Sequence, residues 1–184
     1  MLRLDRTEDF VVRRAVPQDA ARLGRVRAAS WRDAYDGILP DAELRKLSAT
    51  RSAQRLRDAM RSRRGQVVYT VHSPSEYPFG YAWGGPQPDP AFAFGGEIYE
   101  MYLDPGHQRR GAGRQLLAST LWQLAAFGLW PVLIWSLAEN PARHFYEACG
   151  GRQVLAGSVE VAGHALPRVG YAWEQFLPLP SFVR

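Results

Sequence analysis

Short blocks of hydrophobic residues occur at seven places along the chain, and Gly, Pro, Asn or Asp residues separate them. Runs that are rich in β-branched and aromatic residues and lie between such breakers are typical of β-strands. Residues 131–137 (PVLIWSL) form an apolar run, which indicates a strand that is buried on both faces. The pattern predicts strands at residues 10–16, 66–72, 79–84, 97–103, 131–137, 153–161 and 166–173.

Between these strands, hydrophobic residues recur three or four positions apart, which is the period of an α-helix. We expect helices at four places: one that Pro17 opens and that reaches Tyr35, one that Asp41 caps and that runs unbroken to about Met60, one between residues 114 and 128, and one between residues 141 and 150. The order is strand, two helices, three strands, helix, strand, helix and two strands. This order predicts an α/β protein in which helices flank a central mixed sheet.

The length of 184 residues, 46% of them hydrophobic, suits one domain with a full core. We expect a single domain over residues 1–184, with loose termini at 1–9 and 178–184. No apolar run has the length of a membrane span, and the first residues lack the apolar core of a signal peptide. A cytoplasmic protein without a membrane partner is therefore expected. Cys149 is the only cysteine, which excludes an internal disulfide, and no Cys/His cluster predicts a metal site.

The net charge of +5 comes almost entirely from arginine, because Lys46 is the only lysine. A basic surface suits nucleic acid, but it also suits a small ligand that carries several phosphates. The densest group of arginines lies between residues 51 and 64, on a predicted helix, with no aromatic residues between them to stack on bases. We therefore expect a solvated helix face and no nucleic-acid partner, and an arginine-rich nucleic-acid binder remains the alternative.

The segment from Gln108 to Gly113 follows the strand at 97–103 and precedes a helix. The first N–H groups of a helix have no partner within it and carry partial positive charge, so they bind anions. Gly111 and Gly113 have no Cβ, which would let the backbone approach a diphosphate closely. Arg109, Arg110 and Arg114 would add positive potential at the same place. The turn is therefore predicted to bind a phosphate-containing ligand.

Two common phosphate-binding motifs do not fit this turn. A P-loop requires Lys and then Ser or Thr after its last glycine, whereas Arg114 and Gln115 follow Gly113. A dinucleotide-binding motif requires a third glycine, and Leu116 occupies its place.

The run Gln108-Arg109-Arg110-Gly111-Ala112-Gly113, preceded by Tyr102-Leu103-Asp104-Pro105, resembles the acetyl-CoA-binding motif of the GCN5-related N-acetyltransferases, the GNAT superfamily. A second segment, residues 140–150, is similar to another motif of this superfamily, in which an Asn ends a strand and the next helix carries a Phe-Tyr pair. Gly151 departs from the pattern, because the family usually has Phe there. The order and the separation of the two segments support the resemblance.

The resemblance implies a GNAT fold, with a mostly antiparallel sheet of about seven strands in which the cofactor strand and the strand after it splay apart around acetyl-CoA. It implies that acetyl-CoA is the co-substrate and that Tyr146 protonates the leaving thiolate, with Phe145 facing the core. Asn140 would hold the pantetheine arm. The residues expected to bind the cofactor are Met101, Tyr102, Leu103, Gln108, Arg109, Arg110, Gly111, Ala112, Gly113, Arg114, Asn140 and Arg143.

Two carboxylates are candidates for the general base that removes a proton from the acceptor amine. Glu97 lies where histone acetyltransferases of the superfamily carry their base, and Glu100 is the rival. Strand alternation would direct the two side chains to opposite faces, so that only one of them reaches the site. Glu97 is preferred. The backbone N–H of Leu103 could stabilise the thioester oxygen as negative charge develops on it.

The acceptor is expected to lie near Trp31, Tyr35 and Trp83, beside the loop at residues 85–96. The predicted activity is direct acetyl transfer to a primary amine of a small molecule or of a protein or peptide, without an acetyl-enzyme at Cys149. The net positive charge disfavours polycationic acceptors. The alternative is a non-catalytic acetyl-CoA-binding regulatory module of the same fold, and a homodimer stays open.

Overall fold

The computed structural model describes residues 10–37, 39–62, 65–161 and 163–175. The termini that the sequence predicted to be loose, 1–9 and 178–184, lie outside these residues.

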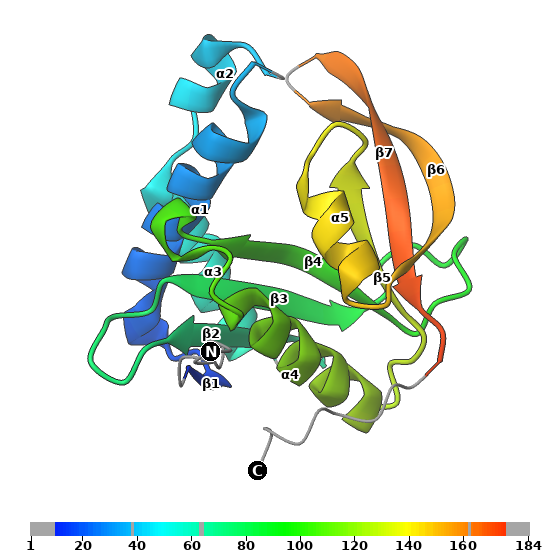
Figure 1. The fold of residues 1–184 in the computed structure, drawn as a ribbon, viewed down its shortest axis with the longest axis horizontal. Coiled ribbons are helices and arrows are strands. Elements are labelled where there is room, and N and C mark those ends of the chain that lie inside the picture. The colour runs from blue at the N-terminus through cyan, green and yellow to red at the C-terminus, as the bar shows by residue number, and fades with distance from the viewer. Residues whose placement is uncertain (1–9, 38, 63–64, 162, 176–184) are drawn as a thin grey trace, which may run out of the picture.

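Within the described residues, one seven-stranded sheet runs through the molecule (Figure 1). All neighbouring strands are antiparallel except β4 and β5, which are parallel. In spatial order the strands are β1 Val11–Arg14, β2 Val67–His72, β3 Gly80–Pro86, β4 Gly96–Leu103, β5 Val132–Leu137, β7 His164–Trp173 and β6 Arg152–Val161. Each predicted strand is present, and the predicted α/β class and mixed sheet are confirmed.

Helices cover both faces of the sheet. They are α1 Ala20–Tyr35, α2 Asp41–Arg45, α3 Ala49–Arg61, α4 Ala112–Ala126 and α5 Ala142–Ala148, with short 3₁₀ turns at Pro17–Asp19 and Pro105–His107. Val68 of β2 packs with Leu23 of α1 and Leu56 of α3. Its neighbour Val67 points to the other face and packs with Leu117 and Leu124 of α4. Alternation along β2 therefore separates an α1–α3 face from an α4–α5 face.

The unbroken helix predicted from residue 41 to residue 60 is wrong, because the chain forms α2 and α3 there. Asp41 is the first helical residue of α2 rather than its cap. Ser48 caps α3, since its hydroxyl oxygen accepts a hydrogen bond from the N–H of Arg51 (3.1 Å). Leu44 and Leu56 pack into two different core clusters, and the side chains of a single straight helix would not reach both.

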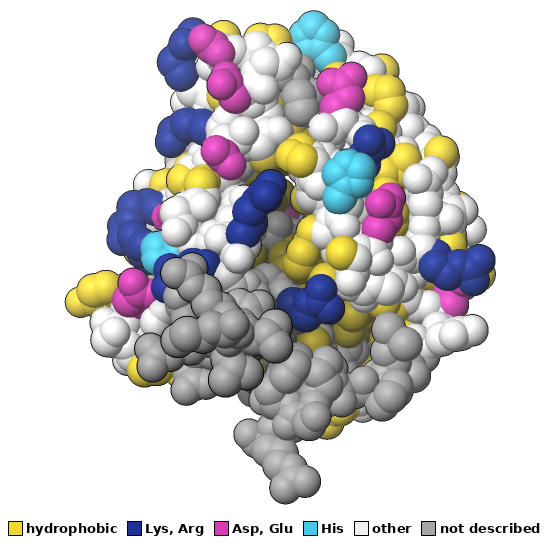
Figure 2. Space-filling model, in the orientation of Figure 1, with side chains coloured by type: hydrophobic (Ala, Val, Ile, Leu, Met, Phe, Trp, Pro, Cys, Tyr) yellow, Lys and Arg dark blue, Asp and Glu magenta, His cyan; other side chains and the backbone are white. Residues whose placement is uncertain are grey.

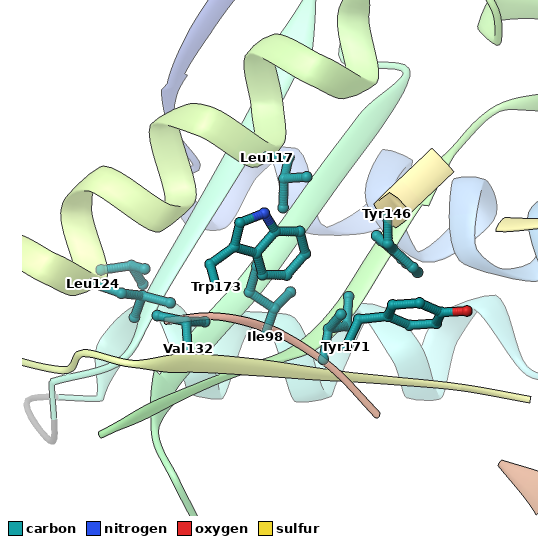
Figure 3. Packing of buried hydrophobic residues seen from close by; sticks show 9 residues of the cluster. Ile98, Leu117, Leu124, Val132, Tyr146, Tyr171 and Trp173 are labelled. Carbon is teal, nitrogen blue, oxygen red and sulfur yellow. The ribbon is translucent and has the colours of Figure 1, made fainter. Parts of the chain in front are cut away.

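The core on the α4–α5 face contains several aromatic residues (Figure 3). Tyr146 of α5 lies with Tyr171 and Trp173 of β7, and its ring centre is 5.9 Å from that of Tyr171. The absence of a side chain at Gly151 has a reason here: a Cβ would lie 3.0 Å from the Trp173 ring. Trp173 thus fills the space next to Gly151, and its indole N–H donates to the carbonyl of Cys149 (2.9 Å).

Strands β4 and β5 separate after a short paired stretch. Their paired residues run only from Gly96 and Val132 to Ile98 and Ile134, although β4 continues to Leu103. Strand β5 remains paired with β7 along its whole length, so it is β4 that loses its neighbour. The splay expected between these two strands is therefore confirmed, and we refer to the unpaired stretch as the splay.

A β-bulge interrupts β4 at the start of the splay. Trp83 of β3 pairs with Glu100, whereas Gly84 pairs with Ile98, so Tyr99 is an extra residue without a partner on β3. A bulge of this kind resets which face the following side chains occupy.

The bulge overturns the prediction that Glu97 and Glu100 point to opposite faces. Ile98 and Met101 are three residues apart, yet both pack in clusters with residues of α4. Glu100 instead contacts Arg27 of α1. Because Glu97 is the neighbour of Ile98 in an extended strand, its side chain points to the same α1–α3 face as Glu100. Both carboxylates are therefore on the α1–α3 face of β4.

Candidate active site

The turn before α4 presents backbone donors to solvent. Arg109 has a positive φ of 59°, and Gly111, the N-cap of α4, has a φ of 92°. Among the described residues, no acceptor meets the backbone N–H groups of Arg109, Gly111, Ala112 and Gly113. Four orphan donors at the N-terminus of a 15-residue helix form an anion-binding surface. Glycine is favoured at position 111, since the left-handed conformation strains other residues.

Gly113 lies against α5. A Cβ on this residue would be 3.4 Å from the ring of Phe145, an ordinary contact distance, so the packing with α5 does not itself require glycine here. Phe145 packs against the core cluster, and its neighbour Tyr146 belongs to the same cluster. Tyr146 is the buried member, with 6% of its surface exposed, while Phe145 is only partly buried and lies against Gly113. The ring of Phe145 thus helps to hold the turn in place.

The polar side chains of the turn are exposed, as a surface for a charged ligand requires. This holds for Gln108, Arg109, Arg110 and Arg114. Figure 2 shows a hollow in the middle of this face of the molecule, with Lys or Arg side chains at its rim. Burial raises the pKa of the nearby Cys149 thiol, although the charge of Arg114 opposes this effect. A neutral thiol is a weak nucleophile.

Backbone groups of β4 face the splay. The N–H of Asp104 donates to the carbonyl of Phe79 (2.7 Å), which fixes the antiparallel hydrogen-bonding pattern with β3. Because this pattern alternates, the backbone groups of Met101 and Leu103 point away from β3, toward the missing neighbour. The hydroxyl of Ser30 already donates to the carbonyl of Leu103 (2.6 Å). The N–H groups at Met101 and Leu103 remain as donors along the edge of the splay.

Asn140 joins α5 to α1 at the open end of the splay, just beyond the last residue of β5. Its Oδ1 accepts a hydrogen bond from the N–H of Ala142 (2.9 Å), and its Nδ2 donates to the hydroxyl of Tyr35 (3.2 Å). Burial raises the pKa of Tyr146, and the nearby Tyr35 raises it further. Tyr146 is therefore protonated at neutral pH and can donate a proton. Arg143 is exposed and donates to the carbonyl of Ala138 (3.2 Å).

Glu100 is held by donors from three other elements. Arg27 of α1 lies 3.3 Å from its carboxylate, Arg55 of α3 lies 3.2 Å away, and the hydroxyl of Tyr81 donates to it (2.6 Å). Only 8% of the Glu100 side chain is exposed. A carboxylate with three such donors is positioned firmly.

Glu97 has a different environment. Burial raises its pKa, while Gln87 and the charge of Arg168 lower it and Asp89 raises it. Within the described residues no cation lies within ion-pairing distance of Glu97. Glu97 is thus the carboxylate that can exchange a proton without losing a salt bridge.

The three aromatic residues predicted to border the acceptor do not form one wall. Trp31 and Tyr35 lie together, with ring centres 4.6 Å apart, and the indole N–H of Trp31 donates to the hydroxyl of Tyr102 (2.7 Å). Trp83 lies apart from them, on β3. The guanidinium of Arg27 lies 5.0 Å from the ring centre of Trp31, and another arginine, Arg55, lies 5.5 Å from that of Trp83. The protein's own arginines therefore approach the rings of Trp31 and Trp83, which were predicted to border the acceptor.

Several residues of the site carried no motif in the sequence. Arg27 is four positions before Trp31, so helical spacing could have indicated their contact. Nothing in the local pattern pointed to Arg55 or Tyr81 as partners of Glu100, or to Trp135 and Arg168 on β5 and β7. These residues come together only through the pairing of distant strands.

No group of three His, Cys, Asp or Glu side chains suited to a metal ion occurs in the described ranges. None of the helices in the described chain has the length and apolar character needed to cross a bilayer. Of the arginines between residues 51 and 64, Arg63 and Arg64 lie outside the described residues.

Comparisons with known proteins agree with this geometry. The profile of the acetyltransferase (GNAT) family matches residues 28–151. The uncharacterized N-acetyltransferase YuaI of Bacillus subtilis (strain 168) is 31% identical over 172 residues, which cover 94% of this chain and 97% of that protein.

Solved structures with the same fold include YncA from Salmonella typhimurium, a putative acetyltransferase determined with acetyl-CoA. It matches with a TM-score of 0.68 and 18% identity over 90% of this chain and 93% of its own. A ribosomal-protein-alanine N-acetyltransferase from Brucella melitensis matches with a TM-score of 0.70 and 19% identity over 90% of this chain and 99% of its own.

Proposed function

The chain belongs to the acetyltransferase (GNAT) family, and we propose that it moves an acetyl group from acetyl-CoA directly to a primary amine of a small molecule or a peptide. The observation that carries the proposal is the splay of β4 from β5, with the orphan N–H groups of the turn before α4 at one end and the Glu97 carboxylate at the other. The family match and the extent of the structural matches also support one catalytic domain.

The chain's own residues offer a place for each part of acetyl-CoA. The N–H groups from Arg109 to Gly113 would bind the diphosphate, aided by the exposed Arg110 and Arg114. The backbone of Met101 and Leu103 would pair with the amides of the pantetheine arm along the free edge of β4. In this arrangement Asn140 acts mainly by fixing α5, since its amide is already engaged within the protein.

The reaction needs a neutral amine. An amine with a pKa near 10.4 costs about 4 kcal/mol to deprotonate at pH 7. Glu97, directly or through a water molecule, would accept that proton. The amine nitrogen then bonds to the thioester carbon, and the oxygen that becomes negative is stabilised by a backbone N–H on the free edge of β4.

Collapse of this intermediate breaks the carbon–sulfur bond. Tyr146 would give its proton to the departing thiolate and recover one from the nitrogen, which loses its second proton at this step. The products are the N-acetylated amine, the thiol of coenzyme A and one proton. Glu100 would position β4 beneath α1 and α3 rather than exchange protons.

The test is to incubate the protein with acetyl-CoA and a panel of amines, and to follow thiol release together with the mass of the acceptor. We expect an acceptor-dependent release of thiol and an acceptor heavier by one acetyl group. Tight binding of acetyl-CoA without transfer to any amine, amino acid, peptide or polyamine would favour a non-catalytic acetyl-CoA-binding module instead.

A further inference from the structure

Arg168 of β7 occupies an unusual position on the α1–α3 face of the sheet. Its guanidinium carbon lies 3.9 Å from the ring centre of Trp135, closer than any other arginine to an aromatic ring among the described residues. The Trp135 ring in turn lies against Gly170, where a Cβ would be 3.4 Å from it, and against Phe92 of the loop before β4. The indole thus serves as a platform that holds the guanidinium in place.

The polar groups of this guanidinium are not used by the protein. In the described part of the chain, Arg168 makes no salt bridge, and its buried Nε has no hydrogen-bond acceptor. A buried guanidinium donor without a partner costs free energy, so an acceptor atom of a bound ligand would be favourable there. A planar guanidinium on an aromatic ring is well suited to bind a carboxylate.

A second side-chain donor, Gln87, lies near Glu97. Gln87 accepts a hydrogen bond from the N–H of Asp89 (3.1 Å) through its Oε1, but its buried Nε2 does not reach any acceptor in hydrogen-bonding geometry. The Gln87 amide is directed at the Glu97 carboxylate and lowers its pKa, as does the charge of Arg168. Two side-chain donors and one carboxylate without a salt bridge therefore share one small region.

We propose that Arg168 and Glu97 together select an acceptor whose amine stands next to a free carboxylate, as in an α-amino acid. The ammonium group would approach Glu97, and the carboxylate would take the donors of Arg168 and Gln87. This inference rests on the proposed acetyl transfer and names the chemical class of its acceptor.

The placement along the strands supports this reading. Glu97 pairs with Leu133 of β5 at the closed end of the splay, and Trp135 follows on the same face of β5. Arg168 pairs with Leu137 on the neighbouring strand. An amine that enters between Glu97 and Arg168 would lie at the closed end of the splay, where we expect the thioester. The negative charge of Asp89 lies nearby, but its Oδ1 accepts from the N–H of Ala91 (2.9 Å) within the exposed loop.

The experiment compares α-amino acids with their α-amides, which have the same side chain and amine but no carboxylate. We expect kcat/KM to be at least about tenfold higher for the acids, the difference that charge-assisted hydrogen bonds typically make. Arg168→Met, which keeps an unbranched apolar stem on Trp135, should bring the ratio of acid to amide close to one. Arg168→Lys should retain part of the ratio, since it keeps the charge but not the planar pair of donors.

Arg152→Met is the matched control. Arg152 is also an arginine of the β6–β7 hairpin, but 79% of its side chain is exposed, so its loss should leave the ratio of acid to amide as it is. Thermal unfolding of each variant checks that it is folded.

Amides that react as well as acids, or a ratio that Arg168→Met does not change, would overturn the inference while acetyl transfer to amines stands. If no acceptor is turned over at all, calorimetry decides, with α-amino acids titrated into protein saturated with coenzyme A. Binding that Arg168→Met abolishes would support the carboxylate site even though the proposed transfer had failed. No binding would refute it.

Discussion

The side-chain amide of Asn140 donates a hydrogen bond to the hydroxyl of Tyr35 at 3.2 Å, although the two residues are 105 positions apart in the chain. This contact joins the start of α5 to the end of α1 across the splay. Because the same amide group also caps α5 through the N–H of Ala142, one side chain sets the position of two elements that border the site.

We expect Asn140→Ala to lower the free energy of unfolding by about 1–3 kcal/mol, since it removes a cap and leaves the buried Tyr35 hydroxyl without its donor. Urea unfolding of Asn140→Ala, Tyr35→Phe and the double variant measures this effect. The two single changes should not add, with a coupling of about 0.5–1.5 kcal/mol. Strict additivity would show that the contact between them contributes nothing.

Glu100 is expected to contribute chiefly to stability. Glu100→Gln leaves Arg27, whose side chain is 13% exposed, without a buried negative charge, and should destabilise the protein by about 3 kcal/mol. Urea unfolding measures the loss. A Glu100→Gln protein of unchanged stability that no longer transfers acetyl groups would reverse the roles of Glu100 and Glu97.

Glu97→Gln should lower kcat by about 10²- to 10⁴-fold, the usual range for a general base. In the parent protein kcat/KM should rise with pH through the pKa of Glu97, which burial places above its ordinary value, because only the ionised carboxylate accepts a proton. If kcat/KM of the Glu97→Gln variant still rose with pH in the same way, the rise would have to come from another group.

The same residue gives a prediction for stability. Since burial raises the pKa of Glu97 in the folded state, protonation favours folding, and this contribution is lost as pH rises through that pKa. Glu97→Gln should therefore be more stable than the parent at pH 7 and equally stable below about pH 4, where the glutamate is protonated in both states. Thermal melts across this pH range provide the comparison, and a variant that is less stable at pH 7 would contradict the assignment.

Tyr146→Phe removes only a hydroxyl from a residue whose ring is packed in the core. We expect kcat to fall by about 10²- to 10⁴-fold with little change in affinity for acetyl-CoA. Steady-state kinetics on a verified acceptor, together with a binding titration, separates the two effects. A Phe variant as fast as the parent would remove Tyr146 from the proton transfer to sulfur.

The parts of this protein that the sequence predicted are those set by local patterns. The apolar run at 131–137 became β5, and the glycine at position 111 became the left-handed N-cap of α4. The parts that it did not predict depend on contacts between distant segments. The chain breaks between α2 and α3 because Leu44 and Leu56 belong to different clusters, which periodicity alone does not reveal.

The candidate site shows the same division. Glu97 and Glu100 were found from the motif, but their orientation was predicted wrongly, because the bulge at Tyr99 depends on the register with β3. The partners of Glu100 and the stacking of Arg168 on Trp135 need residues from several elements. Single-residue roles could thus be proposed from the sequence, whereas the distinction between a positioning carboxylate and an available one required the fold.

The turn before α4 is proposed to bind the diphosphate of acetyl-CoA, and calorimetry with Gly111→Asp tests this most directly. Gly111→Asn is the matched control: both side chains strain the positive φ of 92° in a similar way and face open space, but only Asp brings a negative charge. We predict that acetyl-CoA binds Gly111→Asp at least about tenfold more weakly than Gly111→Asn, because a carboxylate would repel the diphosphate. Equal affinities in two folded variants would contradict the claim.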